Sequence, residues 1–287
     1  TAGTFNYALV SVATGCSNAV AGSTTVTITP LPTATIATSN GNICENASST
    51  VTFTGAVGTP PFTFTYNLNG GATQTISTTG ANTSVSFNVA NVPGTYNYNL
   101  LDVTDTYGCN QTQAGTATIV IDPLPTAAAG GNQRICLSGA ATVNGASSTN
   151  GSISWTENGF GSITAGVNTL APTYQAGAGD EGVPVTLTMT VTSTNACNPQ
   201  TATAIFTVFV DSLPLAIAGG TQTICQTGSA TINGTIARYG SISWAHNGAG
   251  TLTNPTTLTP TYAAVAADAG NVVTLTMTVS STNSCAP

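Results

Sequence analysis

The sequence predicts an all-β chain of tandem β-sandwiches, and two observations lead to this prediction. Short segments alternate apolar and polar residues strictly, which is the period-two pattern of a half-buried strand; examples are residues 62–66 (FTFTY), 185–191 (VTLTMTV) and 273–279 (VTLTMTV). In addition, cysteine pairs and Pro-containing junctions recur with a period near 90 residues. That period is the size of one small sandwich, so we expect an elongated array of such domains.

The domain boundaries are predicted from three junctions that follow one another at steps of 93 and 89 residues. They read Thr29-Pro30-Leu31-Pro32, Asp122-Pro123-Leu124-Pro125 and Asp211-Ser212-Leu213-Pro214. We therefore expect the C-terminal part of a sandwich at 1–29, complete sandwiches at 30–122 and 123–211, and a sandwich without its last strand at 212–287.

The strand expected to be missing from 212–287 corresponds to residues 202–210 (ATAIFTVFV) of the preceding repeat. An unpaired sheet edge beside an apolar groove is an aggregation hazard, so another strand is expected to fill it. The following residues of the same chain are the first candidate in the parent molecule. The other is the segment 23–29 of a neighbouring chain, as in donor-strand complementation.

Turns and one loop complete the predicted sandwiches. Asn-Gly dipeptides, which tolerate positive φ, stand between strand-like segments at 69–70, 158–159 and 247–248. Residues 261–269 are rich in alanine, but their counterpart 173–182 is rich in glycine. We therefore expect a loop with one helical turn at 261–269.

The last two repeats each place a tryptophan between two cysteines. Trp155 and Trp244 both end a Gly-Ser-Ile-Ser-Trp segment and both lie 19 residues after the first cysteine of their repeat. A cysteine, a tryptophan on a central strand and a later cysteine are typical of an immunoglobulin-type sandwich, in which the ring fills the space between two sheets. We expect both tryptophans in the core; the alternative is exposed rings that stack on sugars.

Composition excludes several classes of function. Charged residues make up 4% of the 287 residues, with two basic against nine acidic residues and a net charge of -7. Without a basic patch, neither nucleic-acid binding nor charge-driven membrane attachment is expected. No apolar run approaches the roughly eighteen residues needed to span a bilayer, so membrane insertion is not expected either.

Six of the seven cysteines recur as pairs at separations of 65, 61 and 60 residues: Cys44 and Cys109, Cys136 and Cys197, and Cys225 and Cys285. Such spacing favours disulfides and an oxidising compartment, with buried free thiols as the other interpretation. In the two complete sandwiches we expect the bonds within the domain, Cys44 to Cys109 and Cys136 to Cys197, because each would close a loop of about 60 residues and contribute on the order of 4 kcal/mol. The seventh cysteine, Cys16, is expected to have its partner upstream of residue 1.

A second disulfide pairing stays open. In ordinary immunoglobulin topology the two cysteines of one domain would lie at opposite ends of the sandwich, beyond the roughly 7 Å between Cα atoms that a bridge allows. The early cysteine of one domain would then bond to the late cysteine of the next. This alternative joins Cys44 to Cys197 and Cys136 to Cys285.

Several motifs in a fixed order resemble a known family. They are GTPPFTFTY at 58–66, PGTY at 93–96, DTYGC at 105–109 and the Pro-Leu-Pro joints. Together they resemble the PKD-like and immunoglobulin-like repeats of very large bacterial surface adhesins exported by the type IX secretion system. The resemblance implies an extracellular, cell-attached or filamentous array of immunoglobulin-like (PKD-like) sandwiches with adhesive surfaces and no catalytic residues. The last two repeats depart from the pattern because they lack the PGTY motif.

No catalytic site and no cofactor are expected. Nine acidic residues are spread over four repeats, and the position of His246 is taken by Glu157 in the preceding repeat, so the repeats share no general base. Asp180 and Asp268 occupy matching loops and are the weak candidates for calcium, which takes carboxylate and carbonyl oxygens. The alternative is that this aspartate accepts backbone hydrogen bonds within its loop.

Ser212 is a candidate for O-glycosylation through the resemblance. The triplet Asp211-Ser212-Leu213 is similar to the Asp-Ser/Thr-aliphatic acceptor motif for O-glycans in this class of bacteria.

The expected function is that of a structural, non-enzymatic segment of an extracellular adhesin or filament at the bacterial cell surface, acting as a stiff stalk and adhesive surface. Its partners would be neighbouring repeats of the same long chain, further copies in filaments, or surface glycans. The alternatives are an array of carbohydrate-binding modules and a self-assembling fibre subunit. Sugar binding requires exposed stacking rings, so the exposure of Trp155, Trp244, Tyr174 and Tyr262 discriminates between these functions.

Overall fold

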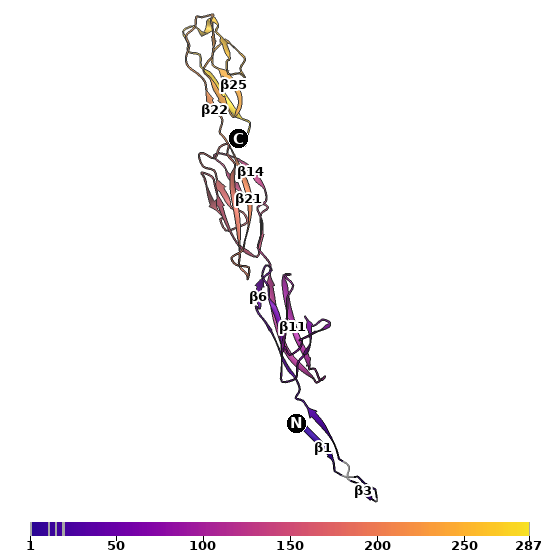
Figure 1. Ribbon diagram of the computed structural model, residues 1–287. Coiled ribbons are helices and arrows are strands. Elements are labelled where there is room, and N and C mark those ends of the chain that lie inside the picture. The colour runs from indigo at the N-terminus through magenta and orange to yellow at the C-terminus, as the bar shows by residue number, and fades with distance from the viewer. Residues whose placement is uncertain (1, 11, 15, 19–20, 287) are drawn as a thin grey trace. The chain divides into compact units, whose positions relative to one another are not determined.

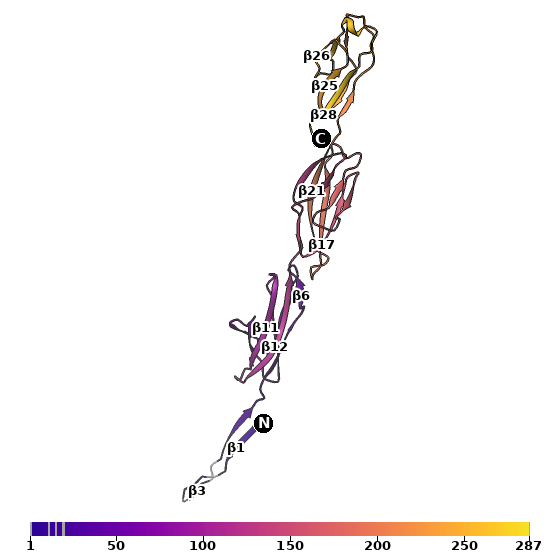
Figure 2. The same ribbon diagram turned by 180° about the vertical axis from the view of Figure 1, so that it is seen from behind.

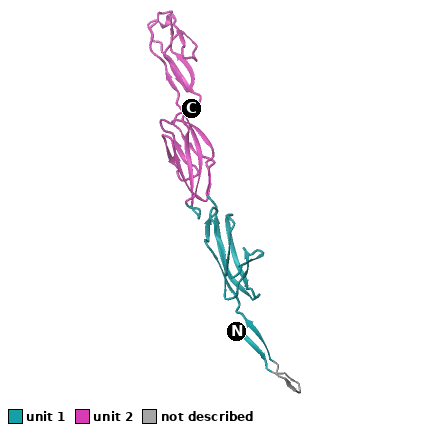
Figure 3. Cartoon of the chain, viewed as in Figure 1, with its two compact units in different colours: residues 1–124, 194–198 teal, residues 125–193, 199–287 magenta. Residues whose placement is uncertain are grey.

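The computed structural model of the protein describes residues 2–10, 12–14, 16–18 and 21–286, without the side chains of 12–14 and 16–18. These residues form two compact units, 1–124 with 194–198 and 125–193 with 199–287 (Figure 3). Regular structure in the described part is strand throughout, apart from the 3-10 turn η1 (Ala266–Asp268). The all-β prediction is confirmed. Within the described residues, no helix has the length and apolar character that crossing a membrane requires.

The N-terminal residues form two-stranded hairpins. Strand β1 (Gly3–Leu9) pairs antiparallel with β4 (Gly22–Ile28), and β2 (Val12–Thr14) pairs antiparallel with β3 (Cys16–Asn18). All side chains of β4 are exposed. The side chain of Cys16, and its expected partner upstream, lie outside the described residues.

Residues 33–122 form two sheets around an aromatic core (Figure 1). One sheet has the order β10-β7-β5, with β5 (Thr33–Thr38), β7 (Thr50–Ala56) and β10 (Ser84–Asn88). The other has the order β6-β12-β11-β8-β9, with β6 (Asn42–Cys44), β8 (Thr63–Leu68), β9 (Thr73–Ser77), β11 (Gly94–Thr104) and β12 (Asn110–Asp122). Alternate residues of β7 and β8 turn inward, so that the rings of Phe53, Phe64 and Tyr66 pack together.

Residues 126–211 form a second sandwich. Its main sheet has the order β14-β21-β20-β17, with β14 (Asn132–Cys136), β17 (Gly151–Glu157), β20 (Val185–Ser193) and β21 (Thr201–Asp211). The facing sheet has the order β15-β19-β18, with β15 (Ala140–Thr142), β18 (Ser162–Ala165) and β19 (Thr173–Gln175). A short pair, β13 (Thr126–Ala128) with β16 (Ser147–Thr149), completes it. The predicted alternation of 185–191 is observed, because every second residue of β20 is buried.

Residues 215–281 repeat this arrangement with fewer strands. Strand β25 (Gly240–His246) pairs with β28 (Leu275–Ser281) (Figure 2), and β22 (Leu215–Ile217) pairs with β24 (Ile236–Arg238). The facing sheet has the order β23-β27-β26, with β23 (Ser229–Thr231), β26 (Thr251–Thr253) and β27 (Thr261–Ala263). The helical turn expected within 261–269 is η1. The repeat boundaries proposed from the junctions stay a prediction.

Candidate functional site

The described residues form two disulfides, and both join cysteines of different predicted repeats. Cys44 is bonded to Cys197, with 4.6 Å between Cα atoms, and Cys136 is bonded to Cys285, with 4.7 Å. The cysteines that are free among the described residues are Cys109 and Cys225. The expectation of bonds within domains (Cys44 to Cys109 and Cys136 to Cys197) is therefore wrong, and the alternative pairing is the observed one.

Strand direction explains the correction. Strand β6 runs parallel to β12 and places Cys44 beside Asp122, the last residue of β12. Cys109 immediately precedes the first residue of β12, which has 13 residues. At about 3.3 Å per residue the two cysteines lie roughly 40 Å apart, far beyond the reach of one bridge. Cys136 likewise lies beside Asp211 at the end of β21, whereas Cys197 precedes the start of that strand.

The loop that connects β20 to β21, residues 194–198, belongs to the first unit and has its contacts at the end of β12. The side-chain amide of Asn195 donates to the carbonyl of Pro123 at 2.9 Å, and the backbone N–H of Ala196 donates to the Asp122 carboxylate at 2.9 Å. The Asn195 side-chain oxygen accepts the N–H of Cys197 at 2.8 Å. We call the Cys44–Cys197 bond together with these hydrogen bonds the first latch.

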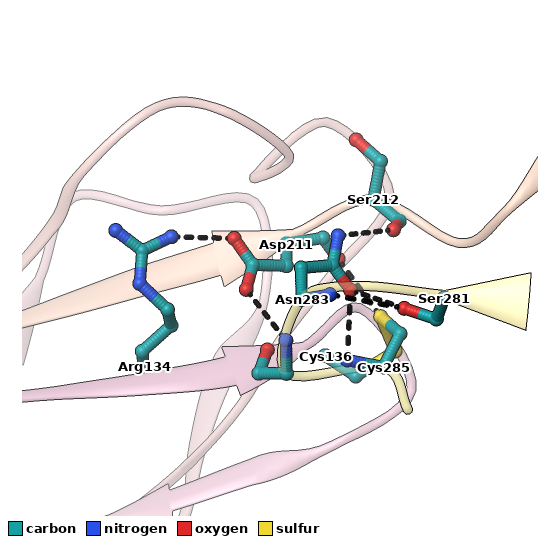
Figure 4. A network of polar contacts seen from close by, with 8 residues as sticks. Arg134, Cys136, Asp211, Ser212, Ser281, Asn283 and Cys285 are labelled. Atoms are coloured by element: carbon teal, nitrogen blue, oxygen red, sulfur yellow. Dashed lines mark hydrogen bonds and ion pairs between the residues drawn. A yellow bond between two sulfur atoms is a disulfide. The ribbon is translucent and has the colours of Figure 1, made fainter. Parts of the chain in front are cut away.

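The same arrangement recurs within the second unit, at the end of β21 (Figure 4). Asn283 donates to the carbonyl of Ser212 at 3.1 Å, and the N–H of Ser284 donates to the Asp211 carboxylate at 3.0 Å. The Asn283 side-chain oxygen accepts the N–H of Cys285 at 2.9 Å. We call the Cys136–Cys285 bond with these contacts the second latch. Each latch fixes a loop before a final strand to the end of the preceding repeat's final strand.

The second latch contains an ion pair that the first latch lacks among the described contacts. Arg134 Nη1 lies 2.5 Å from Asp211 Oδ1, and its guanidinium also lies over the ring of Phe209. Partial burial acts to raise the pKa of Asp211, but hydrogen bonds from Ser284 and the Arg134 cation outweigh it and hold this pKa below its usual value. The carboxylate is therefore ionised, and accepts the Ser284 N–H, at neutral pH.

Sequence reasoning missed Asn195 and Asn283 as latch residues, although a signal was present. The segments TSTNAC at 192–197 and SSTNSC at 280–285 both place an asparagine two residues before the cysteine. Such an asparagine is able to accept the backbone N–H two residues on, which shapes a tight loop. The repetition of this motif after a period of 88 residues distinguishes it from chance.

Both tryptophans lie in sandwich cores. Trp155 and Trp244 are 3% and 6% exposed. Each indole N–H donates to a backbone carbonyl, from Trp155 to Thr169 at 2.9 Å and from Trp244 to Thr257 at 3.0 Å. The rings fill the space between sheets, and their single polar atom is satisfied there.

Asp180 accepts hydrogen bonds from its own loop and from Tyr174. Its carboxylate accepts the N–H of Phe160, the N–H of Gly177 and the hydroxyl of Tyr174, each at 2.7 Å. Asp268 has the matching contacts with Ala249, Val265 and Tyr262. The described residues contain no group of three or more His, Cys, Asp or Glu side chains placed to hold a metal ion. Both carboxylates act as hydrogen-bond acceptors that close a loop onto a buried tyrosine.

Acid is expected to weaken the second sandwich through Asp180. Burial acts to raise the pKa of Asp180, but the hydrogen bonds from Phe160, Gly177 and Tyr174 outweigh it, so this pKa lies below its usual value. A carboxylate of this kind contributes stability above its unfolded pKa of about 4, and that stability is lost as pH falls through the folded pKa. We expect Asp180→Asn to lower the free energy of unfolding at pH 7 by about 1 to 3 kcal/mol, which lowers the urea midpoint. Below pH 4 the urea midpoint of this variant should fall less steeply with pH than that of the parent.

The matched control for this experiment is Glu181→Gln, which removes the neighbouring charge from an exposed side chain. Glu181→Gln should leave the urea midpoint near that of the parent at pH 7. An Asp180→Asn protein whose midpoint falls with acid as steeply as the parent's would refute this role of Asp180.

Ser212, the glycosylation candidate, lies beside the second latch with its side chain partly exposed. Its backbone carbonyl accepts the Asn283 amide (Figure 4), and its glycosylation stays a prediction.

No family model and no curated protein matches this chain. Among solved structures, it is similar to the titin domains I67–I69, at 11% identity, over 87% of this chain and 98% of that chain, with a TM-score of 0.47. It is similar to a 1.5-MDa bacterial ice-binding adhesin at 14% identity, over 88% and 94%, with a TM-score of 0.37. The likeness to the Yersinia pseudotuberculosis adhesin InvE, at 16% identity, covers 61% of this chain and 58% of that chain, with a TM-score of 0.28. At these identities the likeness concerns the immunoglobulin-like fold alone.

Proposed function

We propose that this chain is a non-enzymatic structural segment of an extracellular adhesin or filament at the bacterial cell surface, and that it acts as a stalk of limited extensibility. The observation that supports this most is the overlap of the two disulfides. Cys136 lies inside the loop closed by Cys44 and Cys197, and Cys197 lies inside the loop closed by Cys136 and Cys285.

The overlap of the two disulfides limits how far the chain extends under tension. Three backbone segments run between the same two cross-links: 44–136 with 92 residues, 136–197 with 61 and 197–285 with 88. The shortest segment becomes taut first, because the covalent cross-links cannot slide. Even complete unfolding then separates residues 44 and 285 by no more than the length of 61 residues.

Disulfides of this kind also support an extracellular location, because they persist in oxidising compartments. Export by the type IX system belongs to the same proposal and rests on the resemblance of the sequence motifs. The low charge of the chain, with two basic residues in 287, agrees with a role that needs neither nucleic acid nor an anionic membrane.

Single-molecule stretching of the chain from its two ends tests the stalk function. In the oxidised protein the fully stretched distance between residues 44 and 285 should not exceed about 210 Å, whereas after reduction it should reach about 840 Å, at about 3.5 Å per residue. The double variant Cys44→Ser, Cys136→Ser without reductant is the matched control and should behave as the reduced chain. An oxidised molecule that extends past the lower limit would contradict the proposed mechanism.

A carbohydrate-binding array is less well supported. Trp155, Trp244, Tyr174 and Tyr262 are all buried, and both tyrosine hydroxyls are engaged by aspartates. Stacking on a sugar requires an open aromatic face, which these four rings do not offer.

A further inference from the structure

The last sandwich has a groove at the position that β21 fills in the preceding sandwich. There, β21 pairs parallel with β14 and antiparallel with β20. In the last sandwich the counterpart of β20 is β28, whose one strand partner in the described part of the chain is β25, and the counterpart of β14, residues 221–225, is not in a strand. A cavity of about 750 Å³ is lined from both segments; among its lining residues are Ile224, Cys225, Ala230, Ile232, Trp244 and Leu275.

Apolar and polar side chains both line this groove, and one of its apolar residues is less covered than its counterpart in the preceding sandwich. Ile135 on β14 is 6% exposed, whereas its counterpart Ile224 is 36% exposed. In the preceding sandwich Phe206, Val208 and Val210 of β21 supply the missing cover, and all three are buried. The groove therefore fits one extended strand with apolar side chains at alternate positions.

Strand β4 has this pattern, and within the described residues one of its edges has no strand beside it. Val26 and Ile28 lie on one face of β4, and each is 47% exposed. When Thr29 is aligned with Asp211 at the junctions, Val26 and Ile28 take the positions of Val208 and Val210. Among the described residues, β1 is the one strand that pairs with β4, and an isolated two-stranded hairpin is marginally stable in water. If β4 leaves β1 and pairs with β28 in the groove, it keeps an antiparallel neighbour and buries its apolar face.

The free thiol of Cys225 marks the end of the same groove. Cys225 occupies the position of Cys136, which lies beside Asp211 in parallel register. A β4 strand in the groove, in the register of β21, would place Thr29 beside Cys225.

The free thiol of Cys109 lies beside Thr29, the residue that would lie next to Cys225 when β4 fills the groove. Its Sγ is 3.3 Å from the hydroxyl oxygen of Thr29. In the second latch the Sγ of Cys285 lies 3.4 Å from the carbonyl oxygen of Asp211, the counterpart of Thr29. The strand that fills the groove therefore brings Cys109 of its own chain to Cys225. The two free cysteines are the two halves of a third latch.

We propose that the groove binds strand β4 of a second copy of this chain, and that Cys109 of that copy then forms a disulfide with Cys225. Both thiols lose their protons and together give two electrons to a small-molecule disulfide such as oxidised glutathione, which is reduced to two thiols. Strand β4 and the groove both lie among the described residues of one chain but are different surfaces, so the copies join head to tail. This association goes beyond the stalk function, which a single chain is able to perform.

The experiment uses the full chain with Cys16→Ser, a substitution that removes a cysteine outside the proposal. In a buffer of oxidised and reduced glutathione at neutral pH, non-reducing electrophoresis should show a ladder in steps of 28.4 kDa. Peptide mapping should join Cys109 to Cys225. Adding Cys109→Ser or Cys225→Ser should abolish the ladder, and an equal mixture of these two variants should stop at covalent dimers.

Two β4 variants test whether the strand itself is the occupant. Val26→Asp puts a charge on the face that enters the groove and should abolish the ladder, whereas Thr27→Asp on the opposite face should retain it. Both side chains are exposed and outside any sandwich core, so both variants should fold. The proposal would be overturned if Val26→Asp gave the same ladder as Thr27→Asp. It would also be overturned if the protein stayed a monomer with both thiols free, or if Cys109 and Cys225 formed a bond within one chain. The stretching experiment uses other cysteines, so its outcome is independent of this one.

Discussion

Replacing Cys197 by serine is expected to lower the free energy of unfolding of the oxidised protein by about 5 kcal/mol. The bond to Cys44 spans a sequence separation of 153 residues, and closing so long a loop removes much of the conformational entropy of the unfolded chain. Urea unfolding under non-reducing conditions measures the difference. The hydrogen bonds of Asn195 and Asp122 stay possible in this variant, so the effect reports the covalent bond.

Cys109→Ser is the matched control, because Cys109 is a late-repeat cysteine like Cys197 but carries a free thiol. Serine retains a polar atom that is able to contact Thr29, and the change in free energy should stay within about 0.5 kcal/mol. Equal effects of the two substitutions would show that the Cys44–Cys197 bond does not form in solution. Non-reducing peptide mapping of the parent protein gives the same information directly.

Trp155→Ala is expected to lower the free energy of unfolding of the second sandwich by about 3 to 5 kcal/mol. The indole is buried in a core with Leu187, Met189 and Phe206, and truncation leaves a cavity that rigid sheets do not close. A loss of this size is a large part of the stability of a domain of about 90 residues. Urea unfolding followed by far-ultraviolet circular dichroism measures it.

Two further substitutions separate packing from hydrogen bonding at this site. Trp155→Phe retains most of the ring volume but leaves the carbonyl of Thr169 without its donor, so about 1 to 3 kcal/mol should be lost. Phe160→Ala removes a ring that is 75% exposed and should change stability by no more than about 0.5 kcal/mol. If Trp155→Ala were as stable as Phe160→Ala, the ring would not support the core.

The strands and the core aromatic rings were predictable because their signals are local. Strict alternation places every second side chain on one face of a strand, and in β20 those side chains form the core. Trp155 and Trp244 were expected in cores from their spacing to the cysteines, and they lie there. Asp180 and Asp268 were singled out from matching loops, but their bonds to Tyr174 and Tyr262 depend on how each loop folds back over the sheet.

The sequence by itself determined the strands with strict apolar–polar alternation, the period of the repeats and the positions of the cysteines, because each of these is read from the order of residues along the chain. Tertiary structure alone decided which cysteines meet, since the parallel addition of β6 to β12 and of β14 to β21 places Cys44 and Cys136 at the far ends of those strands. It also decided whether a short segment without strict alternation becomes a strand. Residues 132–136 (NQRIC) and 221–225 (TQTIC) are similar in sequence. Only residues 132–136 lie beside a strand, β21, whose backbone supplies them with hydrogen-bond partners.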